Sequence, residues 1–207
     1  MVSPTDTSDV IVTADAMLGS KSIATIVIII AMQKEALPLV TAFKLSKDID
    51  SSFPDGVPWV WYHGMYKDLN INILCPRKDP VFGVDSVGTV SASLLTYASV
   101  QALKPDLIIN AGTAGGFKAK GANICDCYIA SGVAFHDRRN PIPAAKQYGI
   151  GLQKSFATPN LISDLNLKVG KLSTGDSLDM SEQDYVSISA NDAVIKDMEA
   201  FICWERR

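Results

Sequence analysis

The chain has 207 residues, of which 47% are hydrophobic and 20% are charged, and its formal net charge is −3. These values are typical of a single soluble globular domain that is large enough to bury a core. The negative charge argues against nucleic acid or an anionic membrane as a partner, because neither would be attracted to the protein.

The first segment of the chain, residues 1–22, is polar and acidic. It has no basic segment ahead of an apolar core, so it does not resemble a signal peptide. The apolar run that follows, Ile23 to Met32, is too short to span a bilayer. We therefore expect a disordered N-terminal leader over residues 1–22 and a cytoplasmic protein.

The chain contains four cysteines: Cys75, Cys125, Cys127 and Cys203. Their spacing matches neither a zinc site nor a disulfide framework, so we expect reduced thiols and no structural metal. Cys125 and Cys127 alternate within a strand-like run, which predicts that both face the same side of a sheet.

Strands and helices alternate from residue 23 onward. The β-branched run Ile26–Ala31 is typical of a strand buried on both faces. Apolar residues at helical spacing predict a helix over Gln33–Phe43, in which Pro38 is tolerated only in the first turn. Residues 59–62 and 69–74 predict two strands that form a hairpin.

The pattern continues with a helix over Val87–Leu103 and a second buried strand over Leu107–Asn110. Ile124–Ala134 alternates like a strand, and a short strand at Leu172–Ser173 leads into a polar loop. Strands that alternate with helices imply an α/β fold, with a mostly parallel or mixed sheet between helical layers. These patterns do not define the order of the strands.

Glu35, just beyond the first predicted strand, is a candidate for chemistry. Ligands of α/β proteins gather outside the carboxyl ends of strands, where a carboxylate can act on them. The alternative is an acidic residue that complements the helix dipole in the first turn.

Residues 110–117, Asn-Ala-Gly-Thr-Ala-Gly-Gly-Phe, follow the second buried strand. The glycines let the backbone approach a ligand closely, and Thr113 adds a hydroxyl. The spacing matches neither a P-loop nor a dinucleotide-binding fingerprint, and an ordinary glycine-rich turn is the alternative.

Three further segments are weak signals when taken singly. The polar segment 174–180 is interpretable as an ordinary loop, and Met198 in the run 196–199 as a buried residue at a strand edge. The run His136-Asp137-Arg138-Arg139 is interpretable as a surface charge cluster or a subunit contact.

In their order along the chain these motifs resemble the 5'-methylthioadenosine nucleosidases, within the larger nucleoside phosphorylase and hydrolase family. The resemblance covers residues 23–200 and rests on Ala-Met-x-x-Glu, Gly-Thr-Ala-Gly-Gly-Phe, Thr-Gly-Asp and Asp-Met-Glu-Ala. Residues 102–106, 117–122 and 172–177 are similar to plant members in particular. It implies a three-layer α/β/α sandwich with a mixed central sheet, usually a homodimer, that uses no cofactor.

The implied reaction is hydrolysis of the N-glycosidic bond of 5'-methylthioadenosine to adenine and 5-methylthioribose, a step of methionine salvage. By position, Glu35 matches the carboxylate that activates water, and Thr113 matches a residue beside the ribose. Leu178 falls in the loop that flanks the nucleobase. The pair that holds the ribose matches Met198 and Glu199, and the same binding run includes Lys196 and Asp197.

Glycosidic cleavage passes through an oxocarbenium-like transition state, which requires a base for water, an anion near the ribose and an acid for the leaving group. In the family that acid is an aspartate located beyond the position of Arg207. We therefore expect a C-terminally truncated member with an atypical tail at 201–207, whose rate falls by roughly two to four orders of magnitude.

Three other interpretations remain open at this stage. An inactive truncated variant would only bind nucleoside or a full-length partner. A nucleoside phosphorylase would share the fold but usually has an arginine where Asn110 stands. Related plant storage proteins are exported, which the lack of a signal peptide argues against. Whether S-adenosylhomocysteine is also a substrate cannot be read from these residues.

Overall fold

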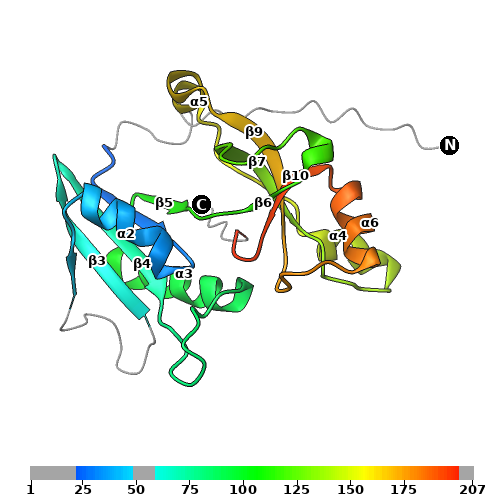
Figure 1. The fold of residues 1–207 in the computed structure, drawn as a ribbon, viewed down its shortest axis with the longest axis horizontal. Coiled ribbons are helices and arrows are strands. Elements are labelled where there is room, and N and C mark those ends of the chain that lie inside the picture. Colours follow the sequence, from blue (N-terminus) through cyan, green and yellow to red (C-terminus); the bar gives the residue numbers. More distant parts are fainter. Residues whose placement is uncertain (1–21, 49–58, 201–207) are drawn as a thin grey trace.

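The computed structural model describes residues 22–48 and 59–200. The leader predicted at 1–22, apart from Ser22, and the tail predicted at 201–207, which includes Cys203, lie outside the described residues. Within the described part the strands form two five-stranded sheets, in the orders β2-β3-β4-β1-β5 and β6-β10-β9-β7-β8 (Figure 1). The expected α/β class with mixed sheets and flanking helices is confirmed, with the strands divided between two sheets.

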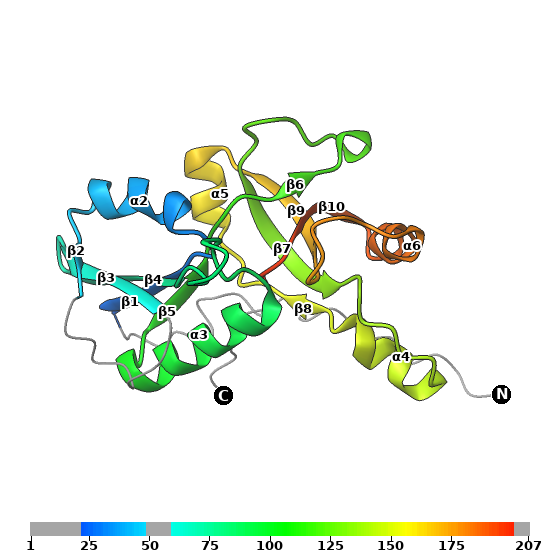
Figure 2. The same cartoon turned by 60° about the horizontal axis from the view of Figure 1, so that its bottom comes forward.

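The first half of the chain builds the first sheet and two helices around it. Its elements are β1 (Thr25–Ile29), α2 (Gln33–Ala42), β2 (Ser46–Lys47), β3 (Trp59–Tyr66), β4 (Leu69–Pro76), α3 (Thr89–Leu103) and β5 (Leu107–Asn110). Strand β1 pairs in parallel with both β4 and β5, while β3 and β4 form the expected antiparallel hairpin. Helices α2 and α3 cover opposite faces of this sheet (Figure 2).

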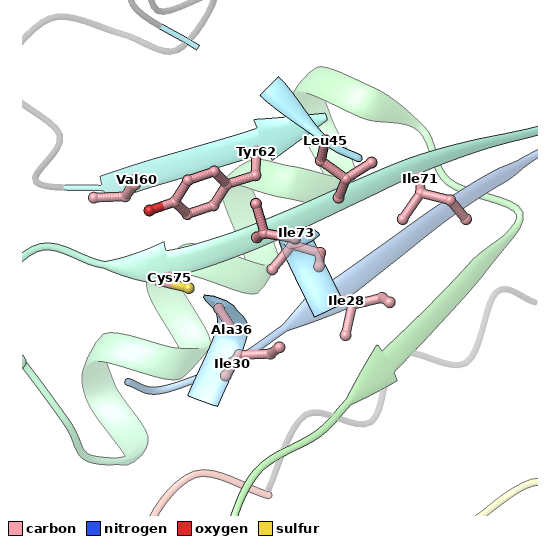
Figure 3. Close-up of a cluster of buried hydrophobic side chains, with 10 residues drawn as sticks. Ile28, Ile30, Ala36, Leu45, Val60, Tyr62, Ile71, Ile73 and Cys75 are labelled. Atoms are coloured by element: carbon pink, nitrogen blue, oxygen red, sulfur yellow. The ribbon is translucent and has the colours of Figure 1, made fainter. Parts of the chain in front are cut away.

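The core of this half explains why the sequence at β1 is an unbroken apolar run. Ile28 and Ile30 pack with Ala36 of α2 on one face, and this cluster, which includes Ile73 of β4, is drawn in Figure 3. Val27 and Ile29 pack on the other face with Leu95 of α3. Because side chains alternate along a strand, only a continuous apolar run can fill both cores.

Two details of this half differ from expectation. Pro38 lies in the interior of α2 and not in its first turn. Proline donates no backbone hydrogen bond, but both Pro38 and Lys34, four residues earlier, are exposed, so water can satisfy the free carbonyl. Strand β5 is an edge strand in which Asn110 is exposed, and it is not the fully buried strand predicted.

The second half builds the second sheet. Its elements are β6 (Gly115–Gly116), the 3₁₀ turn η1 (Lys118–Lys120), β7 (Tyr128–Phe135), α4 (Pro143–Ile150), β8 (Gln153–Lys154), α5 (Pro159–Leu165), β9 (Lys168–Thr174), α6 (Glu182–Ala190) and β10 (Ala193–Asp197). Strands β7, β9 and β10 run parallel. A small cluster of Val133, Leu172 and Ile195 forms its core, separate from the two clusters of the first half.

The prediction for Cys125 and Cys127 is wrong. Strand β7 begins at Tyr128, three residues after Cys125, and both cysteines lie ahead of it with exposed, unpaired thiols. Cys125 has a φ of 69°, which is incompatible with a β-strand. Among the described residues, no helix is both long enough and apolar enough to cross a membrane.

Candidate active site

The motifs singled out in the sequence follow the carboxyl ends of strands in both sheets. Glu35 lies in the first turn of α2, after β1, and Thr113 follows β5. Glu199 lies two residues after the end of β10. Helix α3 connects the halves, because its N-terminus binds carboxylates from the second half. The site therefore lies where the two sheets meet, as is usual for ligand sites of α/β proteins.

Glu35 and Thr113 are in direct contact. The Glu35 Oε1 atom accepts hydrogen bonds from the Thr113 backbone N–H at 2.8 Å and from the Thr113 hydroxyl at 2.5 Å. The Oε2 atom accepts no hydrogen bond from the described residues, so it is available to an incoming water. Glu35 and Thr113 help line an open pocket of about 260 Å³ whose other lining residues are Ile30, Leu39, Ala111 and Gly112.

Glu199 is anchored by backbone amides. Its Oε1 accepts a hydrogen bond from Gly88 N at 3.0 Å, and its Oε2 accepts one from Met198 N at 3.3 Å. Burial raises the pKa of the Glu199 carboxyl, and the nearby charges of Glu35 and Asp176 raise it further, against the lowering effect of the two amides. Glu35 and Glu199 are thus close enough to interact electrostatically, although they come from opposite halves of the chain.

Asp197 faces a different environment from the other acids. The residue is half-buried, and its Oδ1 atom is buried without a hydrogen-bond partner among the described residues. Burial raises the pKa of Asp197 to about 6, with the charge of Glu199 adding to the rise. Met198 lies just after the end of β10 and is half-buried, not fully buried as the sequence predicted.

Lys196 lies away from solvent, with an exposed fraction of 7%. Its ammonium donates hydrogen bonds to the backbone carbonyls of Ser177 at 2.6 Å and Leu178 at 3.3 Å. The Leu178 side chain is 85% exposed. Lys196 therefore holds the loop that presents Leu178, and its charge is directed at that loop.

The sequence suggested that the run 136–139 is a surface charge cluster or a subunit contact. His136 does not belong to such a surface cluster. It is buried, with Nδ1 at 3.2 Å from the Ser173 hydroxyl, and burial lowers the pKa of its imidazole. A Cβ atom at Gly175 would lie 2.6 Å from His136 Nε2 and 2.7 Å from the Asp137 carboxyl carbon, so this position requires glycine. Only Arg138 and Arg139 of the run are exposed, and Arg139 binds Asp184 at 2.6 Å.

The sequence reasoning did not find the acceptor side chain at the start of α3. Asp176 Oδ1 accepts a hydrogen bond from Thr89 N at 2.6 Å, and Oδ2 accepts one from the Thr89 hydroxyl at 2.8 Å. Gly88 has a φ of 111°, which opens the helix for these contacts. The available signal was Gly88-Thr89 as a helix start together with an acid in the loop 174–180, but no rule of spacing links two segments so far apart in sequence.

The described residues hold no group of three or more His, Cys, Asp or Glu side chains placed to bind a metal ion.

Comparison with known proteins identifies the family of the chain. Residues 25–202 match the family model described as the phosphorylase superfamily. A 5'-methylthioadenosine/S-adenosylhomocysteine nucleosidase of Arabidopsis thaliana is 63% identical over 179 residues, which cover 86% of this chain and 70% of that protein.

A second relative, a 5'-methylthioadenosine nucleosidase of Arabidopsis thaliana, is also 63% identical and is covered over 67% of its length. The solved apo structure of an Arabidopsis thaliana 5'-methylthioadenosine nucleosidase superposes with a TM-score of 0.85 at 62% identity, covering 86% of this chain and 73% of that one. The chain therefore belongs to the phosphorylase superfamily and, within it, to the 5'-methylthioadenosine nucleosidases.

Proposed function

We propose that this protein binds 5'-methylthioadenosine and hydrolyses its N-glycosidic bond, releasing adenine and 5-methylthioribose. The observation that carries the proposal is a pair of carboxylates fixed beyond strand ends of the two halves, Glu35 by Thr113 and Glu199 by backbone amides. The 63% identity to nucleosidases of Arabidopsis thaliana supports the same substrate.

In this reaction Glu35 acts on water. Thr113 holds one carboxylate oxygen, Oε1, through two hydrogen bonds and so fixes the plane of the group. The Oε2 atom then accepts a proton from the water that attacks the anomeric carbon as the bond to adenine breaks. Adenine leaves with the electron pair of that bond and takes up a proton from solvent to become the neutral base. A fixed base of this kind lowers the barrier because its orientation is set before substrate binds.

Glu199 binds the ribose in the proposed reaction. Its oxygens accept hydrogen bonds from the ribose hydroxyls, and its negative charge stabilises the positive charge that develops on the sugar ring in the transition state. The amides of Gly88 and Met198 hold the carboxylate in place and leave each oxygen a lone pair that can accept a hydrogen bond from a ribose hydroxyl. Leu178, in the loop held by Lys196, packs against the adenine ring.

The decisive experiment is adenine release from 5'-methylthioadenosine by the purified protein, measured with and without phosphate. Release that does not depend on phosphate is the expected result. A requirement for phosphate would replace the proposal with a phosphorylase, and binding without release would reduce it to a nucleoside-binding protein. S-Adenosylhomocysteine, assayed alongside, defines how the pocket treats a larger 5' substituent.

We also propose that the protein is a homodimer that associates through α3. Val90, Leu94 and Tyr97 form an apolar stripe at helical spacing on this helix, with exposed fractions of 68%, 59% and 59%. A stripe of this kind on an exposed helix face is typical of a protein–protein interface. A second copy of the chain would cover it with an identical stripe.

A further inference from the structure

The start of α3 binds two carboxylates side by side. Gly88 N donates to Glu199, the residue that serves the ribose in the proposed function, and the next amide, Thr89 N, donates to Asp176. The Thr89 hydroxyl adds a second hydrogen bond to Asp176 at 2.8 Å. Two acidic groups from the second half are therefore held by consecutive amides of one helix end from the first half.

Asp176 is itself fixed from the other side. Its backbone N–H donates to Asp137 Oδ2 at 2.7 Å, and the residue before it, Gly175, has no room for a side chain. The Asp176 Oδ1 atom would lie 3.0 Å from a Cβ at Gly88, so the loop and the helix start are packed against each other. The contact between Asp176 and Thr89 thus sets where α3 begins relative to the second sheet.

We propose that Asp176 is a positioning residue for ribose recognition, which holds the start of α3 so that Gly88 presents its amide to Glu199. The proposal rests on the proposed function, because it assigns Glu199 to the ribose. Asp176 acts through Thr89 and Gly88 and has no assigned contact with the reacting atoms. Its two hydrogen bonds are charge-assisted, the kind that holds geometry most firmly.

The test uses Asp176→Asn and Thr89→Val in the full chain, with Asp179→Asn as the matched control. Asp179 is exposed in the same loop and makes no hydrogen bond to the described residues. Two quantities are measured for each protein: the KM or Kd for 5'-methylthioadenosine and the inhibition or binding constant for free adenine. Adenine has no ribose, so it reports on the base pocket alone.

We expect Asp176→Asn to weaken the binding of 5'-methylthioadenosine about tenfold and Thr89→Val to weaken it by a smaller factor. The affinity for adenine should stay unchanged in both variants. Thr89→Ser, which keeps the hydroxyl, should restore wild-type values. Equal weakening of both ligands would mean that the loop around Leu178 has collapsed and would overturn the proposal, as would a variant indistinguishable from Asp179→Asn.

The pH dependence gives a readout that a general structural defect would not move. The titratable groups that face Glu199 are Glu35 from α2, Asp176 from the loop after β9 and Asp197 from β10. The Gly88 amide lowers the pKa of Glu199 more than the charge of Asp176 raises it. If Asp176→Asn displaces Gly88, the pKa of Glu199 should therefore rise, and binding of 5'-methylthioadenosine should be lost at a higher pH than in the wild type. An unshifted acid limb would contradict the proposal. Wild-type protein that neither binds nor cleaves the nucleoside would instead refute the proposed function itself.

Discussion

At the scale of the single residue, Glu35 is the base that activates water in the proposed mechanism. Glu35→Gln keeps the hydrogen-bonding shape but removes the base, so we expect kcat to fall by about 10²- to 10⁴-fold. Affinity for 5'-methylthioadenosine should change little, because Glu199 still holds the ribose. Single-turnover adenine release together with a binding titration measures both quantities, and Lys34→Gln, on the neighbouring exposed residue, is the control. A Gln variant with full kcat would remove Glu35 from the mechanism.

Asp197 lowers the stability of the fold at neutral pH. The pKa of its buried carboxyl is about 6, above the 3.8 of an exposed aspartate, so folding favours the protonated form. The cost is fully present above pH 6 and disappears as the pH falls below 3.8. We expect Asp197→Asn to raise the free energy of unfolding at pH 7 by up to about 3 kcal/mol, and by much less at pH 4.

Urea denaturation of Asp197→Asn and wild type at both pH values checks this expectation. The exposed Asp179→Asn variant should change the free energy of unfolding by less than about 0.5 kcal/mol at either pH. A stabilisation of Asp197→Asn that is the same at pH 4 and pH 7 would exclude the buried charge as its cause.

At the scale of the element, Lys196 of β10 determines the position of a loop in the same half of the molecule. Lys196→Met keeps the length of the side chain but removes the donor that binds the carbonyls of Ser177 and Leu178. We expect adenine to bind about tenfold more weakly. Stability should change little, because a buried ammonium is costly and the freed carbonyls can bind water. Lys171→Met, on the neighbouring strand β9 and half-exposed, is the control. Unchanged adenine affinity in Lys196→Met would show that the position of this loop does not affect binding of the base.

The elements also show how far a sequence can be interpreted. The strand β1, the hairpin of β3 and β4, and α3 were predictable because apolar periodicity and turn residues define them locally. Helix α6 has a local signal only at its start. Ser181 and Asp184 form a capping box at its start. Its weakly amphipathic sequence, with only Asp184 and Ile188 buried, does not indicate a helix.

Site residues were predictable from the sequence to different degrees. The resemblance to a family named Glu35, Thr113 and Glu199, and the structure brings Glu35 into contact with Thr113 and near Glu199. The resemblance did not indicate that Lys196 binds the loop that contains Leu178. Nor did it indicate that His136 is buried or that Asp176 binds the start of α3. Such roles depend on contacts between segments distant in sequence, which no local pattern encodes.

At the scale of the whole molecule, the apolar stripe on α3 is the interface of the dimer that we propose. Leu94→Glu places a charge in the middle of the stripe, and burying it against a second copy would be costly. We expect the mass in solution to fall from dimer to monomer, measured by sedimentation equilibrium. Val186→Glu, an equally exposed apolar residue on α6 at 61% exposure, should leave the mass unchanged. A wild-type monomer at high concentration, or a Leu94→Glu dimer, would contradict the assignment.

The hydrogen bonds between α3 and the second half have a consequence for thermal behaviour. Each half has its own apolar core, whereas Gly88 and Thr89 bind Glu199 and Asp176 through polar contacts for which water competes. Polar contacts of this kind separate at a smaller energetic cost than buried apolar cores. Heating should therefore separate the two carboxylate-bearing halves, and end catalysis, at a temperature where circular dichroism still reports intact sheets. A nucleoside that contacts Glu35 and Glu199 together binds only when the halves are aligned, so it should raise the temperature at which the halves separate toward the temperature at which the sheets unfold.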